Sequence, residues 1–398
     1  MATEQSRGFT AVFLALSLIV HADGAHILAS HAMASNSKAA QSCNNLGIQL
    51  YLILSSGDNN NVVFSPIGLA MAIETTKLGV QVRRKTLEEL IELLELNSRT
   101  LFEDMKKLHE QIIDKRKDGV HVKFENTLLG EDDFKMRVES TNYKLQGNKV
   151  VRDFKNGDTR RNLVNKAVFK AHWEIPFSVF KRSSFFIPGQ KGILDKEVQV
   201  DFMGLMSDEN QLNYFNDEKY RCQVIELNYG KDFVGDSWDP RYSPADVSMV
   251  IVLPFEDQPL RTLEEKLLPG TIERWVSKLE LTNIDVSIPK FNNSILLDAG
   301  VSLKELGVHS IFTKWNSDLS ANPGRGKGKV RSIWQELSIA ASETGTEKPR
   351  VPSEDLSIML IANPKKTFQA DRPFLFFVRD KTTNAMLFMG RVMNPNQS

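Results

Sequence analysis

Apolar residues recur with a helical period in the first third of the chain. Within 85–96 and 101–112 they fall at i, i+3 or i+4 and i+7, the spacing that places them on one face of a helix. These positions are Leu87, Leu90, Ile91 and Leu94 in the first segment and Leu101, Met105, Leu108 and Ile112 in the second. The pattern predicts two amphipathic helices that pack against a core.

Later segments have the patterns of strands. Residues 247–255, VSMVIVLPF, form an almost continuous apolar run, which is typical of a fully buried strand. Apolar and polar residues alternate over 284–288, as in a half-buried strand. Residues 373–380 and 385–392 flank a turn whose last residue, Asn384, tolerates positive φ, so a hairpin is expected there. Helices early and strands late predict an α+β fold.

Composition fits one large globular domain. The chain has 398 residues, 41% of them hydrophobic and 25% charged, with no repeat or low-complexity linker. The 50 basic and 50 acidic residues cancel, which argues against a nucleic-acid partner. Only Cys43 and Cys222 are present, so at most one disulfide is possible and packing must supply the stability.

The N-terminus has the layout of a secretory signal peptide. Arg7 precedes an apolar run from Phe9 to Val20, and small and polar residues follow. We expect residues 1–24 to be removed and the chain, with its domain at 25–398, to be secreted; a buried N-terminal helix is the alternative. No other segment is long enough to span a membrane. Asn292, Asn293 and Ser294 form a glycosylation sequon, although a chance tripeptide is nearly as good an explanation.

No constellation for catalysis, metal or cofactor binding is recognisable. The chain has no G-x-S-x-G motif, and His109-Glu110 lacks the second histidine of a zinc-protease motif. Residues 324–331, GRGKGKVR, lack the spacing of a phosphate-binding loop and are predicted to form a solvated basic loop. Arg325, Lys327 and Lys329 in this loop are candidates for a weak polyanion contact. The sequence therefore does not predict an enzyme.

The segment 342–366 is harder to explain from its residues. Glycine, prolines and polar residues make it look like an exposed loop, yet it contains an apolar cluster at Leu356, Ile358, Met359, Leu360 and Ile361. An exposed loop has no structural reason to carry such a cluster.

Several stretches together resemble the serpins. They are residues 61–80, 342–347 and 368–395, supported by 163–177 and 284–291, which cover nearly all of the chain after the signal segment. The resemblance implies a monomer with three β-sheets, eight or nine helices and an exposed reactive-site loop at about 343–367. It also implies inhibition by a suicide-substrate mechanism. A serine protease cleaves the loop and forms an acyl-enzyme, and the freed part of the loop inserts into sheet A.

The resemblance also implies site residues. By analogy the cleaved bond is Met359–Leu360, which suits a protease with an elastase-like or chymotrypsin-like pocket. The resemblance assigns residues to three places: the hinge of the loop, the shutter where sheet A opens, and the pair that braces the top of that sheet. The hinge is Glu343, Thr344, Gly345, Thr346, Glu347, Lys348, Pro349 and Arg350; the shutter is Ser65, Gly68, Asn165 and Gln335; the brace pair is Lys290 and Glu343.

The hinge departs from the family pattern. Inhibitory serpins have small residues there, but if Thr346 faces inward, a period of two turns Lys348 and Arg350 inward as well. Burying an unpaired charge is costly, and Pro349 and Pro352 each lack a donor that a central strand needs. The alternative is therefore a non-inhibitory serpin, acting as a protease substrate, a carrier or a signalling protein.

Two further departures concern sheet A. Gly68 and Gln335 stand where the family usually has serine and histidine, so the polar network there must be rebuilt or lost. Residues 153–165 are also too few for the long helix that crosses sheet A in most serpins. We expect that helix to be truncated and apolar surface of the sheet to be bare. Either the chain is a splice or gene-model variant, or it covers the sheet in another way.

Overall fold

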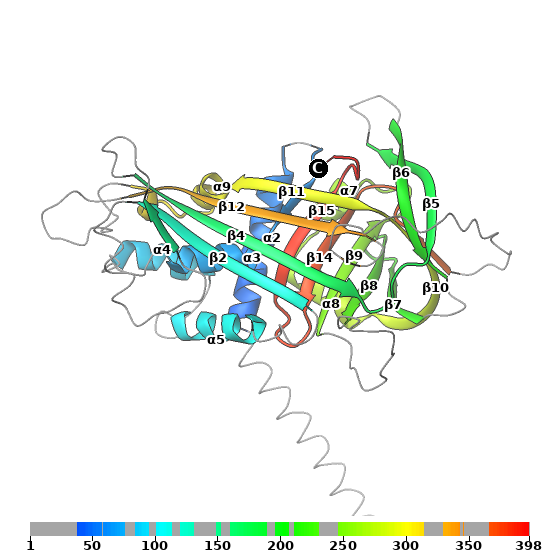
Figure 1. The fold of residues 1–398 in the computed structure, drawn as a ribbon, viewed down its shortest axis with the longest axis horizontal. Helices are drawn as coiled ribbons and strands as arrows, with labels where there is room; N and C mark the ends of the chain where they lie inside the picture. Colours follow the sequence, from blue (N-terminus) through cyan, green and yellow to red (C-terminus); the bar gives the residue numbers. More distant parts are fainter. Residues whose placement is uncertain are drawn as a thin grey trace, which may run out of the picture.

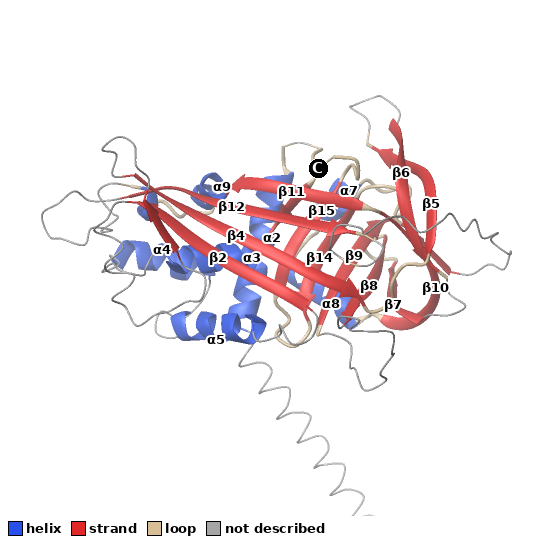
Figure 2. Ribbon diagram, in the orientation of Figure 1, coloured by secondary structure: helices blue, strands red, loops and turns tan. Residues whose placement is uncertain are grey.

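The computed structural model describes residues 38–57, 59–75, 84–94, 101–113, 120–130, 149–152, 160–188, 196–206, 211–230, 246–313, 329–342, 345 and 366–397. Helices and strands alternate in no regular order, and the strands form one connected system that separates into three sheets (Figures 1 and 2). Within the described part of the chain the helices are α2 (Lys38–Ser55), α3 (Pro66–Thr75), α4 (Arg84–Leu94), α5 (Leu101–Ile113), α7 (Leu260–Glu264), α8 (Pro269–Ser277), α9 (Ala299–Glu305) and a 3-10 turn at Ser310–Phe312.

One sheet, here called the long sheet, runs along most of the molecule (Figure 1). Its order is β3-β2-β4-β12-β11, and only the β2–β3 and β4–β12 pairs are parallel. The strands are β2 (Val120–Gly130), β3 (Lys149–Arg152), β4 (Arg160–Trp173), β11 (Phe291–Asp298) and β12 (Lys329–Ala341).

Two other sheets share strand β10 (Glu280–Pro289). Its first half pairs with β7, and its second half pairs with β6 and β13. The central sheet has the order β1-β15-β14-β9-β8-β7-β10, and the side sheet contains β5, β6, β10 and β13. The remaining bounds are β1 (Val62–Phe64), β5 (Val179–Ile187), β6 (Lys196–Leu205), β7 (Gln211–Asp217), β8 (Cys222–Gly230), β9 (Val247–Pro254), β13 (Lys366–Gln369), β14 (Phe374–Asp380) and β15 (Met386–Val392).

The main core lies between the long sheet, the central sheet and helices α2 and α3. Phe169 of β4 packs on Phe388 of β15, with ring centroids 5.4 Å apart, and edge-on against Tyr229 of β8 at 5.1 Å. These aromatic contacts bury large apolar areas and join the two sheets. The inner face of the long sheet is therefore fastened to the body of the molecule.

The predicted helices and strands are confirmed, but Lys329, Val330 and Arg331, predicted to end a basic loop, begin strand β12 instead. Helices α4 and α5 cover the two amphipathic segments, β9 and β10 cover the two predicted strands, and β14 and β15 form the predicted hairpin with Asn384 at φ 59°. Cys43 and Cys222 are both buried and neither is in a disulfide, so the bridge that the sequence allowed is not formed. No helix within the described ranges has both the length and the apolar character needed to cross a membrane.

The connection between β3 and β4 is short. Strand β3 ends at Arg152 and β4 begins at Arg160, so residues 153–159 are all that join them. Seven residues of α-helix would span about 10 Å, whereas five strands side by side span roughly 19 Å. Seven residues are therefore too few for a helix that crosses the long sheet, which contains Asn165 of the predicted shutter and so corresponds to sheet A, in agreement with the expected truncation.

The outer face of the long sheet carries both charged and apolar side chains. Outward side chains in cross-strand register are Glu125 of β2, Lys166 of β4 and Glu336 of β12, and Lys166 Nζ lies 2.9 Å from Glu336 Oε1. Oppositely charged residues facing each other on neighbouring strands favour the pairing. Leu296 of β11, 62% exposed, is the one large apolar side chain exposed on the described part of this face. Val164, Val168 and Trp334 on the same face are half-buried, so charged side chains alternate there with partly covered apolar ones.

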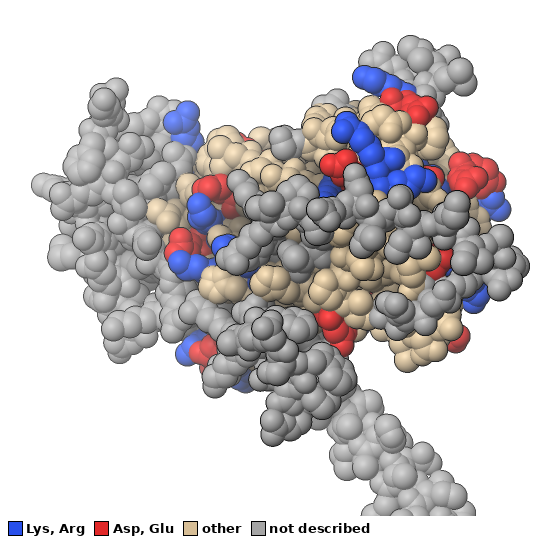
Figure 3. All heavy atoms as spheres, turned by 45° about the vertical axis from the view of Figure 1, so that its right-hand side comes forward, with Lys and Arg blue, Asp and Glu red and all other residues tan. Residues whose placement is uncertain are grey.

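Charges are mixed elsewhere as well. On the face drawn in Figure 3, Lys and Arg side chains have Asp and Glu side chains beside them, as the zero net charge suggests. This arrangement gives that face no extended field of one sign.

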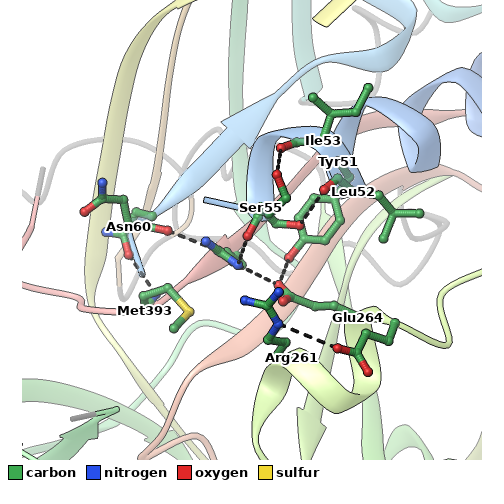
Figure 4. Close-up of polar contacts among 12 residues, drawn as sticks. Tyr51, Leu52, Ile53, Ser55, Asn60, Arg261, Glu264 and Met393 are labelled. Carbon is green, nitrogen blue, oxygen red and sulfur yellow. Dashed lines mark hydrogen bonds and ion pairs between the residues drawn. The ribbon is translucent and has the colours of Figure 1, made fainter. Parts of the chain in front are cut away.

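A buried ion pair ties three distant elements together (Figure 4). Arg391 of β15 donates from Nη1 to Glu264 Oε1 of α7 at 2.9 Å, and the Tyr51 hydroxyl of α2 donates to the same oxygen at 2.6 Å. Arg391 also donates to the carbonyl oxygens of Asn60 and Ser55. Burial and the Glu264 carboxylate raise the pKa of Tyr51 well above its ordinary value. The charges are thus paired and hydrogen-bonded, which their burial requires.

Candidate functional site

The candidate site is the seam between β4 and β12, the two central strands of the long sheet. They pair in parallel from Arg160 and Lys329 up to Val168 and Ser338. Both strands continue beyond that point, to Trp173 and Ala341, and the described residues show no further pairing between them. The two strands therefore separate toward Trp173 and Ala341, and this end of the seam is called its upper end.

A buried polar cluster lies beneath the paired part of the seam. Gln335 of β12 donates from Nε2 to Asn165 Oδ1 of β4 at 2.7 Å and accepts at Oε1 from the Ser65 backbone N–H at 2.7 Å. Asn165 in turn donates to Asn126 Oδ1 of β2 at 2.8 Å, and the Ser65 hydroxyl donates to the Leu387 carbonyl oxygen at 2.6 Å. The cluster thus links both seam strands to their neighbours and to the start of α3.

Gly68 makes room for this cluster. A Cβ at position 68 would lie 2.7 Å from Asn165 Oδ1, 3.0 Å from Ser65 Oγ and 3.1 Å from Gln335 Nε2, closer than ordinary contacts. The bare glycine therefore leaves the space that the Gln335 amide fills. The four residues predicted for the shutter lie together, and their hydrogen-bond network is rebuilt rather than lost.

The upper end of the seam holds the start of the segment after β12. Trp173 of β4 donates from Nε1 to the Ser342 carbonyl oxygen at 2.7 Å. Ser342 and Gly345 exchange backbone hydrogen bonds of 2.8 and 3.2 Å, and the Ser342 hydroxyl donates to the Gly345 carbonyl oxygen at 2.9 Å. The chain therefore makes a tight turn directly after β12.

After this turn Gly345 forms an antiparallel bridge to His172 of β4. His172 already pairs with Gly230 of β8 on one edge, so Gly345 occupies the other edge, the one on the β12 side. Gly345 has φ 148°, and a Cβ there would lie only 2.0 Å from the Ala171 carbonyl oxygen. Only glycine fits this turn without displacing β4.

Aromatic packing holds Trp173 in place. Its ring stacks on Tyr229 of β8 with centroids 4.6 Å apart, and Phe177 packs edge-on at 5.9 Å. Tyr229 is fully buried, which raises the pKa of its hydroxyl. The hydrogen bond from Trp173 to Ser342 is thus presented by a rigid side chain.

A cavity lies away from the seam, between α2, α8 and the β14–β15 hairpin. It has a volume of about 180 Å³, and Ile48, Ile272 and Met386 line it together with Asn44, Asn45 and Arg379. The Arg379 guanidinium donates from Nε to Glu226 Oε1 at 3.1 Å. Burial alone would raise the pKa of Glu226, but Arg379 and hydrogen bonds from Ser248 and Asn213 hold it below its ordinary value. The cavity therefore combines apolar walls with polar groups, among them Glu273 and the Arg379 guanidinium, whose charge Glu226 balances.

Several predicted site residues lie outside the described ranges. They are Glu343, Thr344, Thr346, Glu347, Lys348, Pro349, Arg350, Met359, Leu360, Arg325 and Lys327, together with the side chain of Lys329. Of the predicted brace pair, Lys290 is described, and its Nζ lies 5.1 Å from the centre of the Phe180 ring. The described residues contain no cluster of three or more His, Cys, Asp or Glu suited to a metal ion.

Comparison with known proteins identifies the family. The family model described as Serpin (serine protease inhibitor) matches residues 41–142 and 138–395. The chain is a serpin. Curated relatives include rat (Rattus norvegicus) neuroserpin, 27% identical over 384 residues that cover 86% of this chain and 88% of the relative. Human (Homo sapiens) alpha-1-antichymotrypsin is 25% identical over 388 residues, which cover 87% and 85% of the two chains.

Solved structures share the serpin fold. Human thyroxine-binding globulin in complex with thyroxine superposes with a TM-score of 0.73 at 22% identity, covering 90% of this chain and 99% of the other. Mouse protein-Z dependent protease inhibitor gives a TM-score of 0.70 at 19% identity, covering 92% and 99%. The chain thus has the α+β serpin fold that its sequence predicted.

Three residues of the seam were not predicted from the sequence. Asn126 follows the buried residues Val122 and Phe124 at the next inward position of β2. A polar residue at an inward position of a strand is the sequence feature that could have identified it. Trp173 and Ser342 gave none beyond their place in the family motifs, because their hydrogen bond joins segments 169 residues apart.

Proposed function

We propose that this serpin is a secreted inhibitor of a serine protease and acts as a suicide substrate cleaved near Met359–Leu360. The observation that carries the proposal is the seam. Strands β4 and β12 are paired at its lower end and separate at its upper end, where Gly345 pairs with the edge of β4 that faces β12. A cleaved loop would have a strand position to enter, and the Gly345 bridge would set its register. The rigid Trp173 anchor supports the same role for the turn.

The bridge also defines what insertion would cost. A strand that continued in the register of Gly345 opposite His172 would place Lys348 opposite Phe169 and Arg350 opposite Ala167. Phe169 and Ala167 are each 2% exposed and face the core. Two cations would then enter an apolar layer, at a cost on the order of several kcal/mol each. We therefore expect slow insertion, which gives the protease time to escape after cleavage.

The test is a covalent trap assay. The secreted protein is incubated with an elastase-like and a chymotrypsin-like protease, and the products are separated on a denaturing gel. We expect a minor band at the summed mass and a major cleaved band, and the variant Lys348→Thr/Arg350→Ala should raise the share of the complex at least several-fold. A matched control is Lys304→Thr, on α9 at a distance from the seam. Absence of any complex in both the wild type and the hinge variant would contradict inhibition.

A second candidate function is that of a carrier for a small amphipathic molecule. The cavity between α2 and α8, with apolar walls and a few polar groups that include Arg379 and Glu273, has the features of a ligand site. A structure of the same fold has thyroxine bound. The probe for the test is thyroxine, titrated by calorimetry. Binding that Gln41→Trp, at the cavity wall, weakens at least about tenfold would support the carrier. Leu52→Trp on the same helix, which does not line the cavity, is the control; equal loss in both would contradict it.

A further inference from the structure

The sequon at residues 292–294 lies on the outer edge of the long sheet. Strand β11 pairs with β12, and Asn292 stands opposite Ala340 and Ser294 opposite Ser338. Asn292 and Ser294 are exposed, whereas Asn293 between them is 2% exposed and accepts a hydrogen bond from Asn61. The alternation of the strand therefore turns both chemically required residues of the sequon to solvent.

The side chain of Asn292 is held by its oxygen. The Ser338 hydroxyl donates to Asn292 Oδ1 at 3.4 Å, which directs the carbonyl toward β12. The nitrogen Nδ2, the atom to which an N-linked sugar is attached, is not used in that contact. A sugar on Nδ2 is thus compatible with the hydrogen bond and with the strand pairing.

The surroundings leave space for a bulky group. Asn292 belongs to the outer face that the connection 153–159 is too short to cross with a helix, and Leu296 on the same face is 62% exposed. Leu296 lies four residues along the strand, roughly 13 Å away. Asn292 also stands near the level at which the described β4–β12 pairing ends, because Ser338 is the last residue of that pairing.

We propose that Asn292 carries an N-linked oligosaccharide, which stands on the outer face of the long sheet. The proposal rests on the proposed secretion of the chain. In the transfer, Asn292 Nδ2 forms a bond to the anomeric carbon of a lipid-pyrophosphate-linked oligosaccharide. The bond from that carbon to the pyrophosphate oxygen breaks, the lipid pyrophosphate leaves, and Nδ2 loses one proton.

A second tripeptide of this type, Asn396-Gln397-Ser398, is the natural comparison. There Nδ2 of Asn396 donates to the Gln199 carbonyl oxygen at 3.2 Å. The same tail is clamped by Asn61, which donates to the carbonyl oxygens of Asn394 and Gln397 at 2.8 Å. A sugar on Asn396 would disturb these contacts, so the proposal assigns the modification to Asn292.

The experiment translates the full chain in the presence of microsomes and treats the lumenal product with a peptide N-glycosidase. We expect the wild type to lose mass on treatment. Asn292→Gln and Ser294→Ala should abolish the loss, whereas Ser294→Thr, which keeps the sequon, and Asn396→Gln should retain it. Ser294 is exposed, so folding is not at issue in the comparison of alanine with threonine.

Each outcome decides. A lumenal chain without a change in mass, or a change that only Asn396→Gln abolishes, overturns the site while leaving protease inhibition to its own assay. A chain that stays accessible to added protease outside the microsomes overturns secretion and the glycan together. The site is established if the loss of mass on glycosidase treatment disappears in Ser294→Ala and remains in Ser294→Thr.

Discussion

At the scale of single residues, the lack of a side chain at Gly68 makes room for the long side chain of Gln335. Gly68 leaves open the volume that the Gln335 amide occupies between Ser65 and Asn165. The two departures from the family pattern therefore depend on each other, because glycine at position 68 leaves the space that glutamine at position 335 fills. Substitutions at the two sites should not be additive, because their side chains compete for the same space.

Gly68→Ser should lower the free energy of unfolding by about 1–3 kcal/mol, because its Cβ would push into Asn165 and Gln335. The double variant Gly68→Ser/Gln335→His should recover a large part of that loss. Urea unfolding of the wild type, both single variants and the double variant measures the coupling. Gly270→Ala, where a Cβ meets nothing within 4 Å, is the control. Additive losses would show that the two positions do not share space.

We expect His109 to make the stability of the protein sensitive to acid. It is 7% exposed on α5, and burial lowers the pKa of its imidazole below 6.5 despite the nearby Glu110 carboxylate. Its unfolded form binds the proton more tightly, so stability is lost as pH falls through 6.5 and toward the folded pKa, by up to about 1.4 kcal/mol per pH unit. Urea unfolding between pH 7.5 and 5 should show a smaller decrease for His109→Gln than for the wild type. An equal decrease in both would assign the acid sensitivity to other groups.

At the scale of elements, buried charge joins parts of the chain that no local pattern connects. Glu264 of the short helix α7 accepts from Tyr51 of α2 and Arg391 of β15. One turn of the same segment carries a second ion pair, Arg261 with Glu265 at 3.6 Å, both of whose side chains are about 70% exposed. The two pairs allow burial to be compared within one helix.

Glu264→Gln should cost about 3–5 kcal/mol of stability, because Arg391 would keep its charge in a buried site without its partner. Glu265→Gln should cost less than about 1 kcal/mol, since an exposed pair is weak. Thermal or urea unfolding measures both. Similar losses in the two variants would mean that the buried pair contributes no more than the exposed one.

At the scale of the whole molecule, the fold holds a sheet whose two central strands are paired over only part of their length. Completing that sheet with a new strand would add a ladder of hydrogen bonds, but the register set by Gly345 brings Lys348 and Arg350 into the core layer. The balance between these effects decides whether cleavage of the loop stabilises the protein.

Cleavage of the loop in the wild type should therefore raise the midpoint of thermal unfolding only slightly. In Lys348→Thr/Arg350→Ala cleavage should raise it markedly, because the charges that oppose insertion are gone. Differential scanning calorimetry of intact and cleaved forms measures the change, and the uncleaved double variant is the control. No gain in the cleaved variant would show that the proline residues or the polar cluster, rather than the charges, prevent insertion.

The sequence alone determined the local elements and the family. The helices at 84–94 and 101–113 and the strands at 247–254 and 280–289 follow from hydrophobic periods that depend on neighbours along the chain. The sequence also showed that residues 153–159 are too few for a helix that crosses the long sheet, because this depends only on chain length. Met359–Leu360 stays a prediction.

Only the tertiary structure decided how the seam is built. The Gln335–Asn165 hydrogen bond spans 170 positions, and the Trp173–Ser342 hydrogen bond spans 169. The row of charged residues on the outer face likewise depends on register across three strands. Such contacts depend on which side chains the sheet brings together, and no pattern of neighbouring residues encodes them.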